Sequence, residues 1–238
     1  MTASIALSDL KAFAKKGRVS DLARFYKTGD GEYGEGDLFL GGTVPQTRSV
    51  AKNHQKLELK EIDKLFQSPF HEARLCAAII LNHQFAKAKT SQERKKLFDF
   101  YMKQVWAERV NNWDIVDVSA PWMGVYLTEV KDPGPLLIKL SKSKSLWQRR
   151  VAMILTFALI RAGDLQPTII IAKALLKDDQ DLIHKAVGWM LRESWKRSPK
   201  KVEKFLKENY LVMPRTMLRY AIEKMEEKKR KGFLNHGS

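Results

Sequence analysis

Helical periodicity runs through almost the whole of this 238-residue chain and limits what it can fold into. In the segment SLWQRRVAMILTFALIRAG, apolar side chains such as Met153, Ile154 and Phe157 recur at three- and four-residue spacings, the pattern of one helix face. The segment LIHKAVGWMLRESWKR repeats the pattern with Ile183 and Val187. We find no convincing alternation of apolar and polar side chains over five or more residues. The sequence therefore predicts an all-α fold of about a dozen short helices.

A loose internal repeat lies beneath these helices. Residues 74–77 can be laid over residues 150–153 and over residues 186–189, at offsets of 76 and 36 residues. Half of the first offset leads from Arg74 to Asn112, so a single period near 38 residues fits both offsets. Stacked two-helix units of about this length are typical of HEAT-like repeats. We therefore expect a superhelical array of helical hairpins whose inner helices form a concave, basic surface.

The charge of the chain favours a polyanionic partner. Lys and Arg number 43 against 27 Asp and Glu, a net charge of +16, and 26 of the basic residues but only 15 of the acidic ones follow residue 100. Clustered cations bind nucleic acid by releasing its counterions, so we favour nucleic acid over the alternative of a merely solvated, lysine-rich surface. The apolar stretches are too short to cross a bilayer. A membrane partner is therefore not expected.

The ends of the chain and its cysteine usage indicate a cytoplasmic protein with one domain. The N-terminus has no basic region before its apolar residues, so no signal peptide is expected. The single Cys76 excludes a disulfide framework and fits a reducing compartment. We expect one domain over residues 1–238, beginning with a helix over about residues 1–20. Residues 226–238 are interpreted as a disordered basic tail, with an arm that contacts the partner as the alternative.

One glycine-rich segment and five scattered histidines carry weaker signals. The segment GDGEYGEGDLFLGG, residues 29–42, contains a GxGxxG match, but a helical pattern precedes it and its four acidic residues would repel a pyrophosphate. We interpret it as a structured loop between helices. The histidines include no pair four residues apart, so each is expected at the surface or its boundary. No metal and no other cofactor is expected.

The segment NNWDIVDVSAPW holds the most informative acid. Trp113 and Asp117 are four residues apart and share one helix face. Pro121 is expected to start the next helix, which would place Asp117 in the last turns of its own. A carboxylate there opposes the helix dipole, so it needs either a buried ion pair or a function. Both alternatives stay open at this point.

Two later segments each add one unusual residue. Arg150, next to Arg149, lies on the apolar face of its helix and therefore needs an anion, either a carboxylate or an external phosphate. Trp189 follows Gly188, whose lack of a side chain allows another group to approach closely. Indoles stack on bases and sugars and stabilise cations. An acid, an arginine and two indoles on a cationic surface suggest chemistry on a nucleic acid.

The sequence resembles the AlkD-like family of DNA alkylation-repair glycosylases. The resemblance runs from about Asp21 to Met225 with the motifs in the same order. It rests on the strings FYKTGDGEYGEGDLFLGGTVPQTR, WDIVDVSAPW, SLWQRRVAMI, LIHKAVGWMLRE and PRTMLRYAIEKM. It implies HEAT-like repeats curled around duplex DNA, acting as a monomer without a cofactor. It also implies excision of cationic alkylated purines, chiefly 3-methyladenine and 7-methylguanine.

The resemblance also implies roles for individual residues. Trp113 and Asp117 match the family's Trp-x-x-x-Asp pair, Arg150 matches its motif arginine, and Trp189 matches its second tryptophan. Asp117 is then expected to stabilise the positive charge that develops on the sugar and to orient a water, because a cationic purine leaves as a neutral base. The two indoles are expected to flank the deoxyribose, and the arginine to hold a phosphate.

Further DNA contacts are expected near the N-terminus and in the second half of the chain. The family can present a tyrosine to the lesion near its N-terminus; ungapped alignment places Phe25 there, and Tyr26 is the alternative. Lys27, Arg149 and Lys185 are further candidates for contacts to DNA. The alternative to an enzyme is a non-catalytic HEAT-like module that binds DNA structures or a protein partner.

Overall fold

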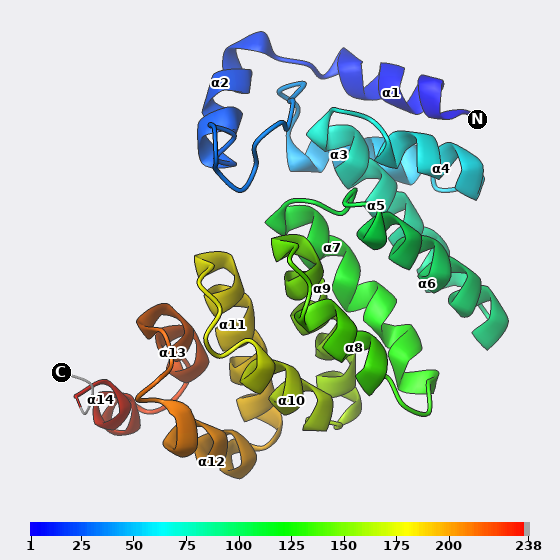
Figure 1. Ribbon diagram of the computed structural model, residues 1–238. Helices are drawn as coiled ribbons and strands as arrows, with labels where there is room; N and C mark the ends of the chain where they lie inside the picture. The colour runs from blue at the N-terminus through cyan, green and yellow to red at the C-terminus, as the bar shows by residue number, and fades with distance from the viewer. Residues whose placement is uncertain (236–238) are drawn as a thin grey trace. The chain divides into compact units, whose positions relative to one another are not determined.

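The computed structural model describes residues 1–235, and within them the chain is helical with no strand, which confirms the all-α prediction (Figure 1). A single isolated bridge joins Leu38 to Phe70. The elements are α1 (Ala3–Ala12), α2 (Lys16–Phe25), α3 (Val44–Asn53), α4 (Leu59–Phe66), α5 (His71–Lys87), α6 (Ser91–Trp106), α7 (Trp113–Met123), η1 (Gly124–Glu129), α8 (Gly134–Ser141), α9 (Leu146–Ala162), α10 (Gln166–Ala174), α11 (Asp181–Arg197), α12 (Pro199–Asn209), α13 (Arg215–Ile222) and α14 (Glu227–Asn235). None of the described helices is both long and apolar enough to cross a membrane.

The chain forms two compact units, residues 1–126 and the part that begins at Leu127. In the first unit α5 packs against α3, α4, α6 and α7. In the second unit α9 and α11 pack together, α8 and α10 pack on α9, and α12 and α13 pack on α11. Alternate helices are therefore neighbours within each unit, as a helical repeat array requires. The division into two units does not decide between one domain and two, so one domain over residues 1–238 stays a prediction.

The spacing of the repeated helices is close to the predicted period. Helices α5, α7, α9, α11 and α13 begin 42, 33, 35 and 34 residues apart, against the predicted 38. Helix α5 is buried on all sides from His71 to Asn82, as expected of a helix at the centre of its unit. Helix α9 is buried almost as completely in the second unit. Each of these two helices has more buried residues than any other helix of its unit.

Prolines mark several helix starts, but Pro121 does not. Pro45, Pro167 and Pro199 lie in the first turns of α3, α10 and α12, as their missing N–H allows. The expectation that Pro121 starts a new helix is wrong, because it lies inside α7 and places Asp117 in the middle of that helix. With no N–H at Pro121, the backbone carbonyl of Asp117 loses its helical donor four residues on. One helical hydrogen bond is missing at this position, but α7 continues to Met123.

A side chain from α5 supports α7 next to this proline. The Asn82 amide donates to the backbone carbonyl of Val118, with 2.7 Å between nitrogen and oxygen. Val118 directly follows Asp117. The bond therefore ties the middle of α7 to the central helix at the turn that carries the predicted catalytic acid.

The glycine-rich segment between α2 and α3 is a folded loop, as predicted. The buried carboxylate of Glu72 accepts hydrogen bonds from the backbone N–H groups of Leu40, Gly41 and Gly42 at 2.9–3.2 Å. Gly41 has a φ of +91°, and a Cβ there would lie 2.3 Å from the carbonyl oxygen of Lys15. Only glycine fits both constraints. The loop is therefore held against α5 rather than left in solvent.

The segment after Met225 is helical where we expected a tail. Helix α14 runs to Asn235 and contacts α12 through an ion pair between Lys229 and Glu203 at 2.8 Å. Its Phe233 ring lies 5.7 Å from the ring of Tyr210, centroid to centroid. The last residues of the predicted tail, 236–238, lie outside the described residues.

Gly188 allows a close contact between α11 and α13. A Cβ at this position of α11 would lie 2.4 Å from the Cβ of Tyr220 and 2.6 Å from the carbonyl oxygen of Met217, both on α13. The sequence predicted a close approach at Gly188, and the approaching group is α13. The glycine therefore sets the distance between the two helices.

We predict that Gly188→Ala lowers the free energy of unfolding by roughly 1–3 kcal/mol, because overpacking outweighs the gain in helix propensity of about 1 kcal/mol. The measurement is urea denaturation followed by circular dichroism. Gly232→Ala in α14 is the matched control, since a Cβ there meets nothing within 4 Å. Equal unfolding curves for the two variants would show that the α11–α13 contact does not constrain this position.

Candidate functional site

Trp113 and Asp117 line one cavity of about 460 Å³ in the first unit. The two residues face it from α7, as their four-residue spacing predicted. Helix α5 contributes Asn82 and His83, and α3 contributes Arg48. We call this space the Asp117 cavity. An acid and an indole are therefore brought together beside basic groups from two other helices.

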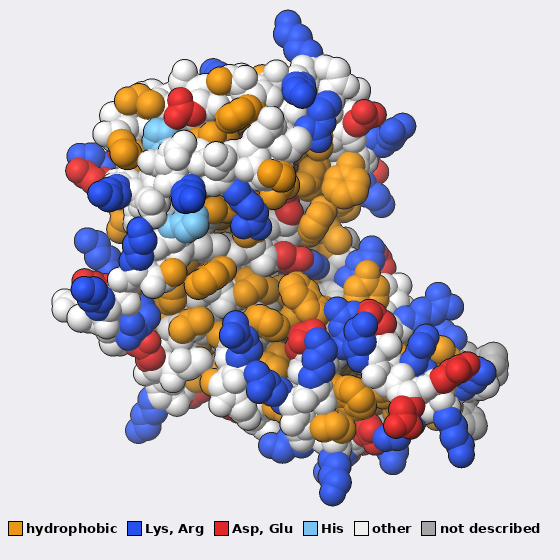
Figure 2. Space-filling model, turned by 180° about the vertical axis from the view of Figure 1, so that it is seen from behind, with side chains coloured by type: hydrophobic (Ala, Val, Ile, Leu, Met, Phe, Trp, Pro, Cys, Tyr) orange, Lys and Arg blue, Asp and Glu red, His pale blue; other side chains and the backbone are white. Residues whose placement is uncertain are grey.

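The edge of the Asp117 cavity is cationic. Arg48 is exposed, and Lys52 lies one turn further along α3. Burial, and then the charges of Lys87, Arg48 and Lys52, lower the pKa of His83. Arg48 lines the cavity, and the charges of all three cations reach His83, so the surroundings of this histidine are cationic. Lysine and arginine are also the most abundant charged groups on the face drawn in Figure 2.

A second indole from the same helix lines the Asp117 cavity. Trp122 directly follows Pro121, and 48% of its surface is exposed. Such exposure is unusual for an aromatic side chain of this size. The sequence contained Trp122 within the motif WDIVDVSAPW, but nothing in its spacing separated it from a core residue. Arg48 and His83 were missed as well, because only the packing of α3 and α5 brings them to α7.

The two aromatic candidates that precede the glycine-rich loop, Tyr26 and Phe25, differ in exposure. Tyr26 is buried, and its ring stacks between Trp113 and Phe39, with centroid distances of 5.6 and 5.2 Å and interplanar angles near 20°. Phe25 is 62% exposed and meets the edge of Trp113 at 5.9 Å. Of the two, Phe25 is therefore the residue that solvent reaches. Lys27 is exposed, with its Nζ 5.9 Å from the ring of Tyr33.

Behind Trp113 lies a buried network of charged groups. His71 places Nε2 2.9 Å from Asp114 and Nδ1 3.3 Å from Asp37. Asp37 also pairs with Arg74, at 2.5 Å between oxygen and nitrogen. Tyr26 donates from its hydroxyl to Asp114 over 2.9 Å. The two carboxylates and two cations balance, as buried charges must.

Ionisation in this network follows from its neighbours. Burial alone would lower the pKa of His71, but Asp114 and Asp37 outweigh it and raise that pKa to about 9. Burial and the carboxylate of Asp114 raise the pKa of Tyr26, so its hydroxyl keeps its proton. His71 and Arg74 together hold the pKa of Asp37 below its usual value despite burial. His71 is therefore positively charged and Asp37 negatively charged at neutral pH.

The histidine expectation was wrong for two residues. His71 and His54 are buried, at 2% and 5% exposure, where we expected surface or boundary positions. His54 binds Asp9 from α1, with 2.6 Å between nitrogen and oxygen. The partners of both histidines are more than 30 residues away, so no local pattern signals their burial. His236 lies outside the described residues.

The candidates of the second unit are held by bonds within that unit. Arg149 pairs with Asp178, with 2.6 Å between Nε and Oδ2, and donates to the backbone carbonyls of Ser143 and Lys144. The buried Arg150 donates to the backbone carbonyl of Leu182.

The other two candidates of the second unit lie on α11. Trp189 is half-buried, with its ring 6.1 Å from the ring of Phe157. Lys185 pairs with Asp181 at 2.7 Å. The predicted meeting of the second-unit candidates with Trp113 and Asp117 stays a prediction.

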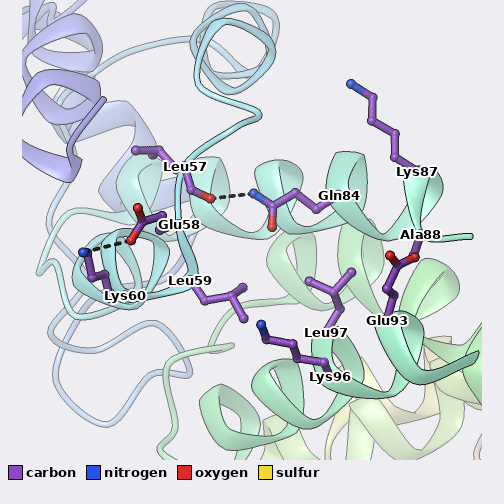
Figure 3. Close-up of a pocket in the computed structure, with 10 residues that line it drawn as sticks. All are labelled: Leu57, Glu58, Leu59, Lys60, Gln84, Lys87, Ala88, Glu93, Lys96 and Leu97. Carbon is purple, nitrogen blue, oxygen red and sulfur yellow. Dashed lines mark hydrogen bonds and ion pairs between the residues drawn. The ribbon is translucent and has the colours of Figure 1, made fainter. Parts of the chain in front are cut away.

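A second cavity of the first unit is larger, about 650 Å³, but its polar groups serve local structure (Figure 3). Lys60 pairs with Glu58 at 2.8 Å, and Gln84 donates to the carbonyl of Leu57 over 2.7 Å. Glu93 accepts from the backbone N–H groups of Lys89 and Thr90 and so caps the start of α6. This Leu57 cavity lacks the indoles and the central acid of the Asp117 cavity. Chemistry on a cationic substrate is therefore better served by the Asp117 cavity.

Comparisons with known proteins bear on the fold and the family of the chain. None of the curated proteins compared with this chain is similar to it. A solved structure described as "Predicted DNA alkylation repair enzyme from Enterococcus faecalis" has the same fold. Its TM-score is 0.69 at 18% sequence identity, over 90% of this chain and 97% of that one. Residues 6–225 match the sequence profile of the family described as DNA alkylation repair enzyme. Because that match spans both units and nearly the whole sequence, the chain belongs to the DNA alkylation repair enzyme family.

Proposed function

We propose that this protein is a monofunctional DNA glycosylase. It hydrolyses the N-glycosidic bond of cationic alkylated purines, such as 3-methyladenine and 7-methylguanine, in duplex DNA. The observation that carries the proposal is the joint position of Trp113 and Asp117 in one cavity with a cationic edge. The family adds that the chain is a DNA repair enzyme for alkylation damage. DNA is therefore the proposed partner, and the alkylated nucleotide the proposed substrate.

The chemistry needs little more than a placed carboxylate. Alkylation of a ring nitrogen gives the purine a positive charge, so the base departs neutral and requires no general acid. Positive charge then develops on the sugar. Asp117 stabilises that charge and orients the attacking water, as carboxylates do in glycoside hydrolysis. The face of Trp113 adds cation–π stabilisation and excludes solvent. None of the described residues that line this cavity is a lysine, so strand cleavage through a Schiff base is not proposed.

Three cations near the cavity fit the phosphates on either side of the target. Arg48, Lys52 and Lys87 act on His83 at the edge of the Asp117 cavity. Guanidinium and ammonium groups bind phosphate oxygens, and their charge attracts DNA from a distance. These groups thereby hold the strand while the sugar faces Asp117.

Residues of the second unit make separate contributions to the proposal. Part of the Trp189 indole is exposed, and we assign it to the deoxyribose. Arg150, whose guanidinium donates to the carbonyl of Leu182, is assigned to a phosphate. Arg149 is tied to Asp178 and is therefore a weaker candidate for DNA contact. Substitution of each residue tests its assignment without reference to the others.

We predict that Asp117→Asn lowers the single-turnover rate of 7-methylguanine release from methylated duplex DNA by about 100-fold or more. The neutral amide keeps the shape but cannot balance the sugar cation. Asp99→Asn is the control, since Asp99 is an exposed acid on α6 that pairs only with Lys95. Affinity for DNA is expected to be unchanged or slightly higher. Equal rates for Asp117→Asn and wild type would remove Asp117 from the mechanism.

The salt dependence of DNA binding reports the phosphate contacts. We predict that Arg48→Ala and Lys52→Ala each lower the slope of log affinity against log salt by roughly 1, because each removes one neutralised phosphate. Lys60→Ala is the matched control, because Lys60 lines the Leu57 cavity instead. Fluorescence anisotropy with labelled duplex measures the slopes. Identical slopes for Lys52→Ala and Lys60→Ala would place the strand elsewhere. If the DNA affinity of the wild-type protein does not change with salt, the alternative of a protein partner is favoured.

Trp122 is expected to contact the nucleotide through its exposed indole. We predict that Trp122→Ala weakens binding to duplex containing an abasic site by roughly 5- to 100-fold, while Trp122→Phe keeps most of the affinity. Trp106→Ala is the control, because Trp106 is 38% exposed on α6 and does not line the cavity. If the two alanine variants bind equally well, Trp122 is a surface residue without a role in recognition.

A further inference from the structure

A closed circuit of hydrogen bonds surrounds the start of α7. Asp37, from the loop after α2, accepts from His71 and also from the side-chain amide of Asn112 at 3.1 Å. Asn112 caps α7, and its Oδ1 accepts the backbone N–H of Trp113 over 2.9 Å. Asp114, the residue after Trp113, closes the circuit, because its Oδ2 lies 2.9 Å from Nε2 of His71. Trp113 therefore lies between two residues that the same imidazole holds, directly or through Asp37.

The geometry requires His71 to carry two protons. Both of its ring nitrogens face carboxylate oxygens, which only accept hydrogen bonds. A neutral imidazole has one N–H and leaves its other nitrogen facing a carboxylate without a proton between them. The imidazolium donates to both. His71 is thus a charged bridge between the loop carboxylate Asp37 and the α7 carboxylate Asp114.

The Trp113 indole depends on this bridge through two paths. Its backbone is fixed by Asn112, which has a φ of +129° and so holds a conformation that an L-residue rarely adopts. Asp37 supplies the bond that keeps Asn112 in place. The Trp113 ring lies flat against the ring of Tyr26. The Tyr26 hydroxyl donates to the same oxygen of Asp114 that His71 contacts. Loss of the bridge would release the cap and the stacked ring together.

We propose that His71 is a positioning residue, whose charged bridge between Asp37 and Asp114 holds the Trp113 indole at the wall of the Asp117 cavity. This role rests on the proposed function for its effect on catalysis. The effect on the position of Trp113 does not depend on any activity. His71 itself does not line the cavity, so it acts on the substrate only through Trp113.

The bridge has a defined pH range. The groups that face His71 are Tyr26 from the end of α2, Asp37 from the loop and Asp114 from α7, with Glu72 and Arg74 beside it on α5. Because the folded pKa of His71 is about 9 against 6.5 for a free side chain, its contribution is complete below about pH 6.5. It is lost as the pH rises through 9. Tyr26 keeps its proton in this range, since its own pKa is raised.

The test follows Trp113 directly by fluorine NMR of protein labelled with 5-fluorotryptophan. Trp113→Phe assigns its signal among the six tryptophans. Between pH 7 and 10 the Trp113 signal of wild type is expected to shift with a midpoint near 9. In His71→Gln, the signal is expected to begin at a different position and to show no such step. Trp195, in the second unit, serves as the internal reference.

Kinetics give the second measurement at pH 7.5. His71→Gln is expected to lower the single-turnover release of 7-methylguanine by roughly 10- to 100-fold, as displaced reacting groups do, with DNA affinity unchanged. His54→Gln is the matched control: it removes another buried histidine of the first unit, bonded to Asp9 rather than to the circuit. It is expected to alter neither the Trp113 signal nor the rate. If His71→Gln does not fold, Tyr26→Phe replaces it, since loss of one hydroxyl should also move the Trp113 signal.

Two outcomes would overturn the inference. One is a Trp113 signal that keeps its wild-type position and pH step in His71→Gln or, for Tyr26→Phe, its wild-type position. The other is an equal effect of His71→Gln and His54→Gln, which would show a general loss of stability. If wild type releases no 7-methylguanine, the proposed glycosylase function fails, and the fluorine signal still decides whether His71 holds Trp113.

Discussion

The bridge from Asp37 through His71 to Asp114 organises the first unit. Each of these groups is nearly buried, and a buried charge is tolerated only when it is paired. Removing one partner of such a pair typically costs about 3–5 kcal/mol, because the other charge is then left alone in the interior. The loop after α2, the central helix α5 and the start of α7 must therefore be in place together. The cavity wall formed by Trp113 follows from that requirement.

The second unit solves the same problem with different contacts. Arg149 and Asp178 form a partly buried ion pair, and Gly188 brings α11 and α13 to a distance that no larger residue permits. These contacts fix the packing of α9, α11 and α13 against one another. Arg150 donates to the backbone carbonyl of Leu182, which ties the start of α9 to α11. The residues of this unit assigned to DNA stand on a rigid helical frame.

The sequence was sufficient for the helices and for one part of the site. Apolar periodicity predicted the all-α fold, and the four-residue spacing of Trp113 and Asp117 predicted a shared face, which the Asp117 cavity confirms. Pro121 was misread because local propensity places proline at helix starts, whereas packing against α5 carries α7 past it. Propensity is a weak prior when tertiary contacts oppose it. The boundary of α7 was therefore beyond local reasoning.

The remainder of the site depends on pairs distant in sequence. Asp37 and His71 are 34 residues apart, and His71 and Asp114 are 43 apart. Arg48 reaches the cavity only because α3 packs beside α5. A single sequence carries no signal for such pairs, since each residue alone resembles an ordinary surface charge. The choice between Phe25 and Tyr26 also required the structure, which buries one ring and exposes the other.

The central claim is that this protein removes alkylated purines by hydrolysis in the Asp117 cavity. The most direct measurement is mass spectrometry of the bases that the wild-type protein sets free from methylated duplex DNA in water enriched in oxygen-18. The account predicts free 7-methylguanine and 3-methyladenine, unmodified guanine retained in the strand, and one heavy oxygen on each abasic sugar. Duplex that is bound by the protein but loses no alkylated base would contradict it.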